Sequence, residues 1–279
     1  MTDTLRILHL SDTHLYGDGR LHYGIVDTLA ALDRVLARAA SLAEVDLIVA
    51  SGDLSDDGTA ASYRKLKATL EPWAAERGAA VVYAMGNHDL PDGFEGVLGA
   101  RETETTVRGF RVVTVDTSVP LAGYGRVEEA QLDRLRDLLA TPSESGTVVV
   151  LHHPPVAPTT VLFESLRLID SQPLLDTLSE GDVRLVLAGH YHHGLVTEAG
   201  PAGIPVVVAP AVANTTDVLW PAPRERAVRG AGFAWVQLPD DGPARAHLVS
   251  APAPDDGETV YDLDAAGVQR IADDAGWRG

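Results

Sequence analysis

The amino-acid sequence predicts an α/β fold built as a four-layer α/β/β/α sandwich, in which two mixed β-sheets pack face to face and helices flank them. Three observations lead to this expectation. Short apolar runs that end in polar residues recur along the chain, helical patterns separate several of these runs, and the later runs follow one another with turns and little helical pattern. A chain of 279 residues can bury one large core, so its length does not require a second domain.

Six mostly apolar runs are predicted to be buried strands, because each is short and lacks the polar alternation of a half-exposed strand. They lie at residues 5–10, 46–50, 79–84, 112–115, 148–151 and 183–188. A helix is predicted over residues 26–40, where apolar side chains recur at the spacing of one buried helix face. The same pattern predicts helices over residues 60–70 and 132–139.

The later part of the chain predicts a second, more antiparallel sheet. Residues 206–209 and 232–238 are expected to lie in that sheet, packed on the first. Proline and glycine punctuate residues 251–257, which predicts a linker before a short helix within residues 261–276 that caps the fold. We therefore expect residues 1–250 to form one catalytic domain, and residues 251–279 to form a linker and C-terminal capping segment.

Composition excludes several kinds of site and partner. The chain has 40 acidic and 22 basic residues, with a formal net charge of −18, so no nucleic-acid polymer is expected as a partner. It has no cysteine, so a metal site must use His, Asp, Asn or Glu. No apolar run approaches the ~20 residues that span a bilayer, and residues 1–4 lack the basic start of a secretion signal. A cytoplasmic location is expected.

Polar motifs follow five of the predicted strands, at the carboxyl ends where α/β folds place their sites. The first strand ends in Asp12-Thr13-His14; in an extended chain, residues two apart point the same way and can reach one ion. The second strand ends in Gly52-Asp53, where glycine permits close approach and a carboxylate can bridge two cations. Each motif alone is also typical of a loop hydrogen bond or a helix N-cap.

The other motifs are richer in histidine. They are Gly86-Asn87-His88-Asp89, His152-His153-Pro154-Pro155 and Gly189-His190-Tyr191-His192-His193. Seven of the ten histidines of the chain fall in these motifs or in the first one, all just after predicted strands. Chance does not account for this placement, so we interpret the five motifs as parts of one metal site.

Taken in order, these motifs resemble those of the calcineurin-like metallophosphoesterase family, over roughly the first 195 residues. A closer resemblance is to the bacterial class III cyclic-nucleotide phosphodiesterases. It rests on residues 7–15, 62–66, 85–89, 115–120 and 151–155. The resemblance implies a dinuclear metal site and a phosphodiesterase whose leading substrate is 3′,5′-cyclic AMP, hydrolysed to 5′-AMP. Broader phosphodiesterase or phosphomonoesterase activity, on 2′,3′-cyclic nucleotides or glycerophosphodiesters, is the alternative.

The resemblance also implies a role for each motif residue. Asp12, His14 and His192 are expected to hold one metal; the other is expected to be held by Asn87, His152 and His190. Asp53 is expected to bridge the two ions, and His153 to lie behind the ligands. His88 matches the histidine of the family that contacts the phosphoryl group, and Asp89 is expected to orient it. Asp53 and His88 are thus the catalytic candidates.

Nitrogen and oxygen ligands suit Mn, Fe, Zn or Co, and the resemblance implies Fe with Mn, or two Mn ions. Two cations ~3.5–4 Å apart lower the pKa of a shared water, so the implied mechanism is attack by a hydroxide that bridges the metals. A small phosphodiester, such as a nucleotide, is the expected partner. A non-catalytic binding module on the same fold is a different class, but such modules are expected to lose ligands and none is missing here.

Three features stay open at this level. The apolar residues 156–169 fit a lid over a nucleotide base, a dimer contact or part of the core. If they form a dimer contact, the protein is expected to be a homodimer. Residues 214–229, with Asn214 and three arginines, fit either a substrate entrance or a charged loop. His193 has no assigned role.

Overall fold

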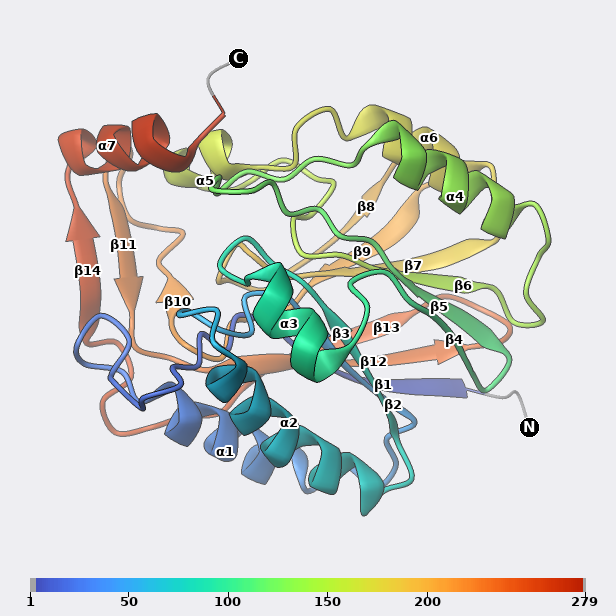
Figure 1. The fold of residues 1–279 in the computed structure, drawn as a ribbon, viewed down its shortest axis with the longest axis horizontal. Coiled ribbons are helices and arrows are strands. Elements are labelled where there is room, and N and C mark those ends of the chain that lie inside the picture. The colour runs from blue at the N-terminus through green and yellow to red at the C-terminus, as the bar shows by residue number, and fades with distance from the viewer. Residues whose placement is uncertain (1–3, 278–279) are drawn as a thin grey trace.

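The computed structural model describes residues 4–277, in which two mixed sheets pack face to face and helices cover both outer faces (Figure 1). The fold class expected from the sequence is confirmed. The first sheet consists, in spatial order, of β13 (Arg245–Ser250), β12 (Gly232–Pro239), β1 (Thr4–Leu10), β2 (Leu47–Ser51) and β3 (Ala80–Ala84). The second consists of β4 (Glu104–Val107), β5 (Phe110–Thr114), β6 (Thr147–Val150), β7 (Val183–Ala188), β9 (Ile204–Val208) and β8 (Leu195–Ala199).

The six predicted strands form, but they divide between the sheets. β1, β2 and β3 run parallel in the first sheet, whereas β5, β6 and β7 run parallel in the second. Parallel strands in both sheets bring their carboxyl ends to the same edge of the sandwich. That edge is where the polar motifs begin.

The placement of the later strands was predicted correctly only for β9. β12 was expected in the second sheet, but it pairs antiparallel with β1 in the first, with Ile7 opposite Val236. β9 does lie in the second sheet, yet it runs parallel to β7 and antiparallel only to its hairpin partner β8. The chain returns to the first sheet because the edge of β1 not covered by β2 needs a hydrogen-bonding partner.

Alternate residues of the central strands face different layers. In β1, Ile7 packs between the two sheets, whereas Leu8 packs against the outer helices. Both faces of the strand are therefore buried, which explains why its sequence is nearly continuous in apolar residues. The interlayer core also contains Leu47, Val148 and Leu185.

Helices cover the outer faces. The first sheet is covered by α1 (Thr28–Ala39), α2 (Ala60–Ala75) and α3 (Pro91–Leu98); the second is covered by α4 (Glu129–Leu139) and α6 (Gln172–Ser179). Local signals set the helix starts: the Asp27 carboxylate accepts from the Ala30 N–H, and the Thr59 hydroxyl accepts from the Ser62 N–H.

A smaller sheet and two helices stand at one end of the sandwich (Figure 1). The sheet consists of β10 (Thr215–Thr216), β11 (Glu225–Val228) and β14 (Thr259–Leu263). After β14, α7 (Ala265–Ala275) packs against α5 (Val161–Leu166). Residues 251–257 contain neither helix nor strand, and a helix does follow, but the intervening strand was not predicted. Residues 1–3, used above for the signal expectation, and 278–279 lie outside the described part of the chain.

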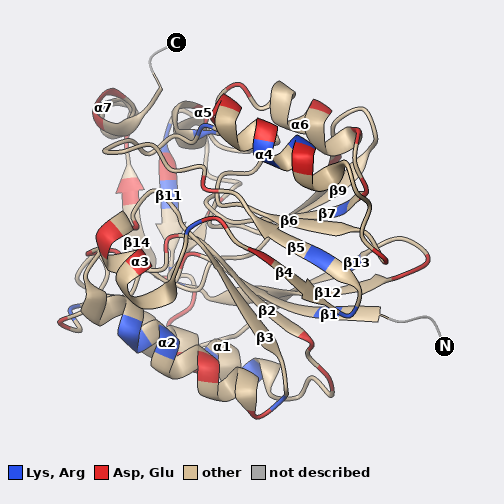
Figure 2. Ribbon diagram, turned by 45° about the vertical axis from the view of Figure 1, so that its right-hand side comes forward, with Lys and Arg blue, Asp and Glu red and all other residues tan. Residues whose placement is uncertain are grey.

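Basic residues do not gather into a stripe. Figure 2 shows them scattered over α2, α4, β5 and β11, with acidic residues between them. Within residues 4–277, no helix combines the length and apolar character needed to cross a membrane. The described residues therefore form no continuous basic stripe of the kind that tracks a nucleic-acid backbone.

The interlayer core makes a direct prediction for stability. Leu185→Ala should lower the free energy of unfolding by about 2–5 kcal/mol, because it leaves a cavity between two sheets that cannot close around it. Val196→Ala, on the exposed face of β8, is the control and should change the free energy of unfolding by less than about 0.5 kcal/mol. Urea unfolding of metal-free protein, followed by circular dichroism, measures both; equal effects would contradict this account of the core.

Candidate metal centre

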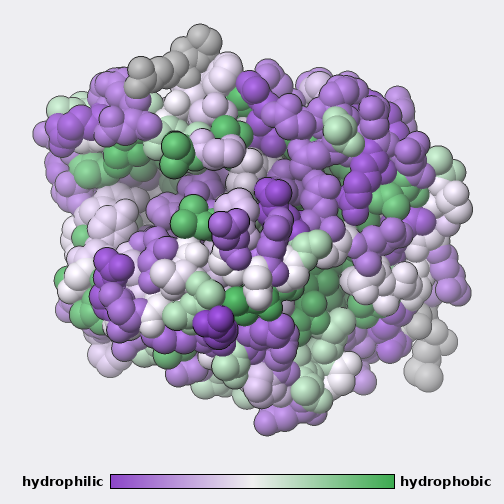
Figure 3. Space-filling model, viewed as in Figure 1, coloured by the Kyte–Doolittle hydropathy of each residue, from purple (hydrophilic) through white to green (hydrophobic). Residues whose placement is uncertain are grey.

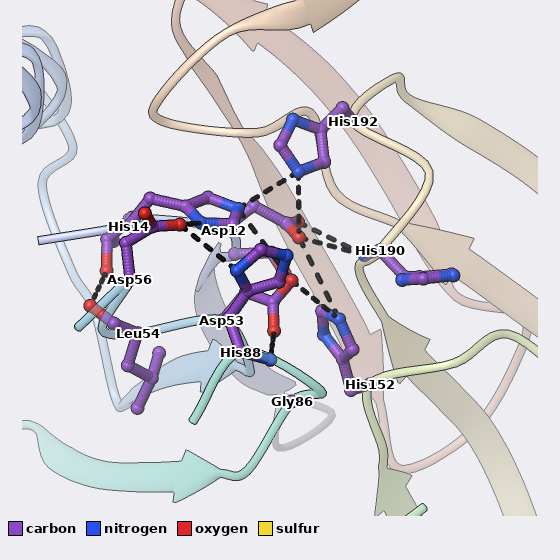
Figure 4. Close-up of polar contacts among 12 residues, drawn as sticks. Asp12, His14, Asp53, Leu54, Asp56, Gly86, His88, His152, His190 and His192 are labelled. Atoms are coloured by element: carbon purple, nitrogen blue, oxygen red, sulfur yellow. Dashed lines mark hydrogen bonds and ion pairs between the residues drawn. The ribbon is translucent and has the colours of Figure 1, made fainter. Parts of the chain in front are cut away.

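The five motifs converge in loops at the carboxyl ends of β1, β2, β3, β6 and β7 (Figure 4). The loops after β1 and β2 run side by side and continue the parallel pairing of their strands. The Asp12 N–H donates to the Gly52 carbonyl at 3.0 Å, and the His14 N–H donates to the Asp53 carbonyl at 2.9 Å. Backbone hydrogen bonds alone thus fix the positions of these two motifs relative to each other.

The ligand candidates do not lie in extended chain. Five of them have positive φ angles: Asp12 54°, His14 43°, Asp53 49°, His190 71° and His192 53°. Such left-handed backbone is costly for residues other than glycine and is found where surrounding structure imposes it. The argument from strand alternation for Asp12 and His14 was therefore wrong in its reason, since a turn in the backbone, and not the pleat, directs the side chains inward.

Two glycines make the close packing of these loops possible. Gly52 has φ 101°, and a Cβ there would overlap the ring of His152. A Cβ on Gly86 would overlap the backbone and carboxylate of Asp53. The site is built so tightly that a methyl group at either position displaces a ligand candidate.

Asp53 lies at the centre of the group. Its Oδ2 is 3.7 Å from His14 Nε2 and 3.3 Å from His152 Nε2, while its Oδ1 accepts the His88 N–H at 2.8 Å. One carboxylate oxygen thus stands between imidazoles that come from the two different sheets. This is the arrangement expected of a ligand shared by two ions.

A first set of possible ligands surrounds one side of Asp53. His14 Nε2 and His192 Nε2 are 3.1 Å apart, and His192 Nε2 is 3.4 Å from Asp12 Oδ1. Ligand atoms of Asp12, His14, Asp53 and His192 all lie within 4.8 Å of one another. Four such atoms, from two carboxylates and two imidazoles, suit one transition-metal ion.

Three further ligand candidates lie near Asp53: His152 Nε2 is 3.3 Å from its carboxylate, and Asn87 and His190 line the same cavity. The Oδ1 atom of Asn87 and the Nε2 atom of His152 are buried, and neither has a hydrogen-bond partner. Buried polar atoms without partners are costly, and a cation would satisfy both. The residues present therefore fit a second metal ion.

Each imidazole in the two sets uses one ring nitrogen for an outer partner, and in His14, His152 and His192 the other nitrogen faces the carboxylate of Asp53 or Asp12. The outer bonds are His14 Nδ1 to Asp56 at 2.8 Å, His152 Nδ1 to the Ser51 carbonyl at 2.8 Å, His190 Nε2 to the Leu166 carbonyl at 2.8 Å and His192 Nδ1 to Asn214 at 2.9 Å. Outer partners of this kind fix ring orientation and tautomer in metal sites. The rings of His14, His152 and His192 are thus prepared to offer one lone pair inward, and His190 keeps Nδ1 apart from its outer partner.

Asp56 was missed by the sequence analysis. Its carboxylate contacts His14 Nδ1, the hydroxyl of Tyr16, and His88 Nδ1, the last at 3.1 Å. The expectation that Asp89 orients His88 is wrong, because the carboxylate of Asp89 is buried and accepts backbone N–H groups of Leu54, Ser55 and Gly86. The sequence did offer a signal for Asp56: the acidic pair Asp56-Asp57 follows Gly52-Asp53 in the same loop. A loop that carries one metal-ligand candidate can also carry a residue that supports another.

Asn214 has a contact that the sequence analysis did not foresee. It lines the cavity but is buried: its Oδ1 accepts from His192, and its amide nitrogen lies 3.2 Å from His22 Nε2. No local pattern marks this residue. Of the arginines nearby, Arg224, Arg226 and Arg229 pair with Asp262, Asp217 and Asp255, which agrees with a charged loop.

His153 and His193 stand apart from the centre. His153 lies near His152 and His190, but its Nδ1 bonds to Thr117 and its Nε2 to the Gly123 carbonyl, so neither nitrogen is available. His193 stacks on Tyr191 at a ring distance of 5.9 Å. Both positions agree with supporting roles.

Burial and charge shift the pKa values of the group strongly. Burial alone would raise the pKa of Asp12, but His192 outweighs it and brings the value to about 2. Burial lowers the pKa of His190 to about 3, whereas for His152 the charge of Asp53 overcomes burial and raises the pKa to about 9. The carboxylates thus stay ionised and attract positive charge, for which protons and metal ions compete.

A cavity of about 340 Å³ opens from this centre. His14, Asp53, Asn87, His88, His190 and His192 line one side, and the side chain of His88 is 46% exposed. The apolar residues 156–169 are mainly core, and Leu162, Phe163 and Leu166 of α5 also line the cavity. Of the three explanations left open for that segment, part of the core is confirmed, whereas the lid and the dimer contact stay predictions.

A cluster of buried carboxylates and imidazoles beside a cavity of this size is the arrangement of a metal-binding active site. The sequence profile described as calcineurin-like phosphoesterase matches residues 5–194, and the chain belongs to this family. The family, together with the clusters of His and Asp side chains in this centre, indicates two metal ions.

Curated relatives refine the class. The chain is 40% identical over 278 residues to a probable cyclic nucleotide phosphodiesterase of Rhodococcus erythropolis, covering 94% of this chain and 91% of the relative. It is 40% identical over 220 residues to a cAMP/cGMP dual specificity phosphodiesterase of Mycobacterium tuberculosis, covering 76% and 69%. It is 31% identical over 248 residues to a 3′,5′-cyclic adenosine monophosphate phosphodiesterase of Pseudomonas aeruginosa, covering 85% and 86%. The chain is a hydrolase that acts on phosphodiester bonds.

Solved structures share the fold at low identity. A purple acid phosphatase from yellow lupin matches with a TM-score of 0.65 at 13% identity, covering all (100%) of this chain and 57% of that one. A dimetal phosphatase from Danio rerio matches with a TM-score of 0.57 at 14% identity, covering 89% and 99%. Both likenesses concern the fold alone.

The position of Asp53 predicts its effect on metal binding. Asp53→Asn should reduce metal content from about two ions to less than one per chain, because the shared negative charge is lost from both sides; Asn87→Ala should lose mainly one ion. Elemental analysis after Mn reconstitution measures this, with Asp137→Asn on the exposed face of α4 as control. Full metal content in Asp53→Asn would contradict a shared ligand.

Proposed function

We propose that the chain hydrolyses a cyclic nucleotide, with 3′,5′-cyclic AMP converted to 5′-AMP as the leading reaction. The observation that carries this proposal is a single cavity with a metal-binding side and an apolar side. The first side suits a phosphodiester and the second suits a base. The printed names of the relatives from Rhodococcus, Mycobacterium and Pseudomonas point the same way.

The proposed metal ligands fall into two sets joined by Asp53. Asp12, His14 and His192 would hold one ion; Asn87, His152 and His190 would hold the other. Fe with Mn, or two Mn ions, would suit these nitrogen and oxygen donors. When bound, two such ions activate a water between them and neutralise charge on the phosphoryl oxygens.

His88 is the proposed contact to the phosphoryl group. Asp56 holds its Nδ1 at 3.1 Å, so its Nε2 is left to face the cavity. Burial opposes protonation of His88, but in the metal-free protein the charges of Asp53 and Asp56 raise its pKa to about 9, and Asp56 keeps its contact with Nδ1 whether or not Asp53 binds metal. A cationic imidazole in this place would stabilise negative charge as the phosphoryl group is attacked.

The charge of the cavity favours a diester over a monoester or pyrophosphate. No Lys or Arg is found among the described residues that line it. A phosphodiester has one negative charge, which the metal ions and His88 can balance, whereas a monoester or a pyrophosphate brings more. Positive side chains are the usual ligands for such additional charge.

A substrate panel tests the proposed activity. Metal-reconstituted protein should show a higher kcat/KM for 3′,5′-cyclic AMP than for 2′,3′-cyclic AMP, a bis-aryl phosphate or a mono-aryl phosphate. A chelator should abolish activity, and added Mn should restore it. Faster turnover of the monoester would replace the proposal with a phosphomonoesterase.

The role of His88 makes a separate prediction. If its charge stabilises the phosphoryl oxygens, His88→Ala should lower kcat/KM by about 10²–10³ for both cyclic AMP and a bis-aryl phosphate, because that charge develops whichever group leaves. Both rates are measured at equal metal content. A loss at least about tenfold greater for cyclic AMP would instead identify His88 as the acid that protonates the poor leaving group.

A further inference from the structure

The side of the cavity opposite the metal centre is built by residues beyond the part that matches the family profile. That profile ends at residue 194, whereas Tyr261, Leu263, Ile271 and Ala275 all line the cavity. They belong to β14 and α7, which together span residues 259–275 and are called here the C-terminal unit. In Figure 3, hydrophobic residues follow the lower side of α7, above a recess in the surface.

The C-terminal unit is fixed to the core rather than loosely attached. β14 pairs antiparallel with β11, and α7 packs on α5. At the end of α7, the Gly123 N–H donates to the Ala275 carbonyl at 2.7 Å, and the Trp277 N–H donates to the Ser165 carbonyl at 2.7 Å. The wall is therefore held in a defined place relative to the metal centre.

This wall offers flat and apolar surface but no charged side chain. The rings of Tyr261 and Tyr23 lie 5.2 Å apart, and both residues line the cavity. From α5, Leu162 and Phe163 continue the surface. The amides of the lining, Asn87 and Asn214, both lie with the metal-binding histidines. Such a surface can stack on a base or pack against its face, but has no side-chain amide of its own to read the base edge.

We propose that the C-terminal unit is the element that selects substrates carrying a nucleobase. Tyr261 contributes a ring for stacking, and Leu263 and Ile271 contribute apolar contact, while the phosphate is held at the metal centre. This inference rests on the proposed function and adds a specificity determinant to it. The chemistry then comes from the motifs before residue 194, and the choice of substrate from the end of the chain.

The test compares two substrates that share one reacting group. These are 3′,5′-cyclic AMP and the base-free methyl β-ribofuranoside 3′,5′-cyclic phosphate, and the readout is the ratio of their kcat/KM values. Tyr261→Ala should lower this ratio about tenfold or more, because stacking on a base is lost. Tyr261→Phe should keep the ratio close to that of the unmodified protein, because the aromatic ring remains. Arg270→Ala, on the exposed side of α7, is the matched control and should keep the ratio of the unmodified protein.

A second variant covers the case in which Tyr261→Ala does not fold. Ile271→Trp adds bulk to the wall and should lower the same ratio by excluding the base, and metal analysis checks that the centre is intact. An unchanged ratio in the folded variants would overturn the inference but leave the proposed function standing. Equal turnover of both substrates by the unmodified protein would likewise overturn the inference and leave the proposed function standing. Turnover of neither would overturn both.

Discussion

The structure depends on the buried carboxylate of Asp53, which stands between imidazoles from two sheets. One of its oxygens lies within 3.7 Å of His14 Nε2 and within 3.3 Å of His152 Nε2. A buried charge is costly unless it is paired, and no Lys or Arg is among the described residues of this cavity. Bound cations are the compensation that the surrounding nitrogen and oxygen atoms can accept.

The rest of the centre follows from the need to bring donors to that point. Parallel strands in both sheets end at one edge, so loops from β1, β2, β6 and β7 meet there. Left-handed backbone at Asp12, His14, Asp53, His190 and His192 then turns the side chains inward. Hydrogen bonds between the loops, such as that from the Asp12 N–H to the Gly52 carbonyl, stabilise this unfavourable backbone conformation.

Chemistry and selection are separated along the chain but joined in space. The metal-binding motifs lie within residues 5–194, whereas the facing wall of the cavity includes Tyr261 and Ile271. Since fold and cage alone do not set the substrate, this wall is the part of the cavity proposed to set it. The antiparallel pairing of β14 with β11 keeps that wall close to the centre.

The sequence by itself determined the fold class and the set of motifs that meet, because buried strands and the polar residues that end them are written in local order. It missed Asp56 and the contact of Asn214 with His192, and it assigned Asp89 to His88 when Asp89 binds backbone N–H groups. It also placed β12 in the wrong sheet. Only the tertiary structure decided these points. Each depends on hydrogen bonds between residues far apart in the chain, such as Asn214 with His192, or on a turn of the backbone. Long-range hydrogen bonds and single turns leave no periodic signal in the sequence.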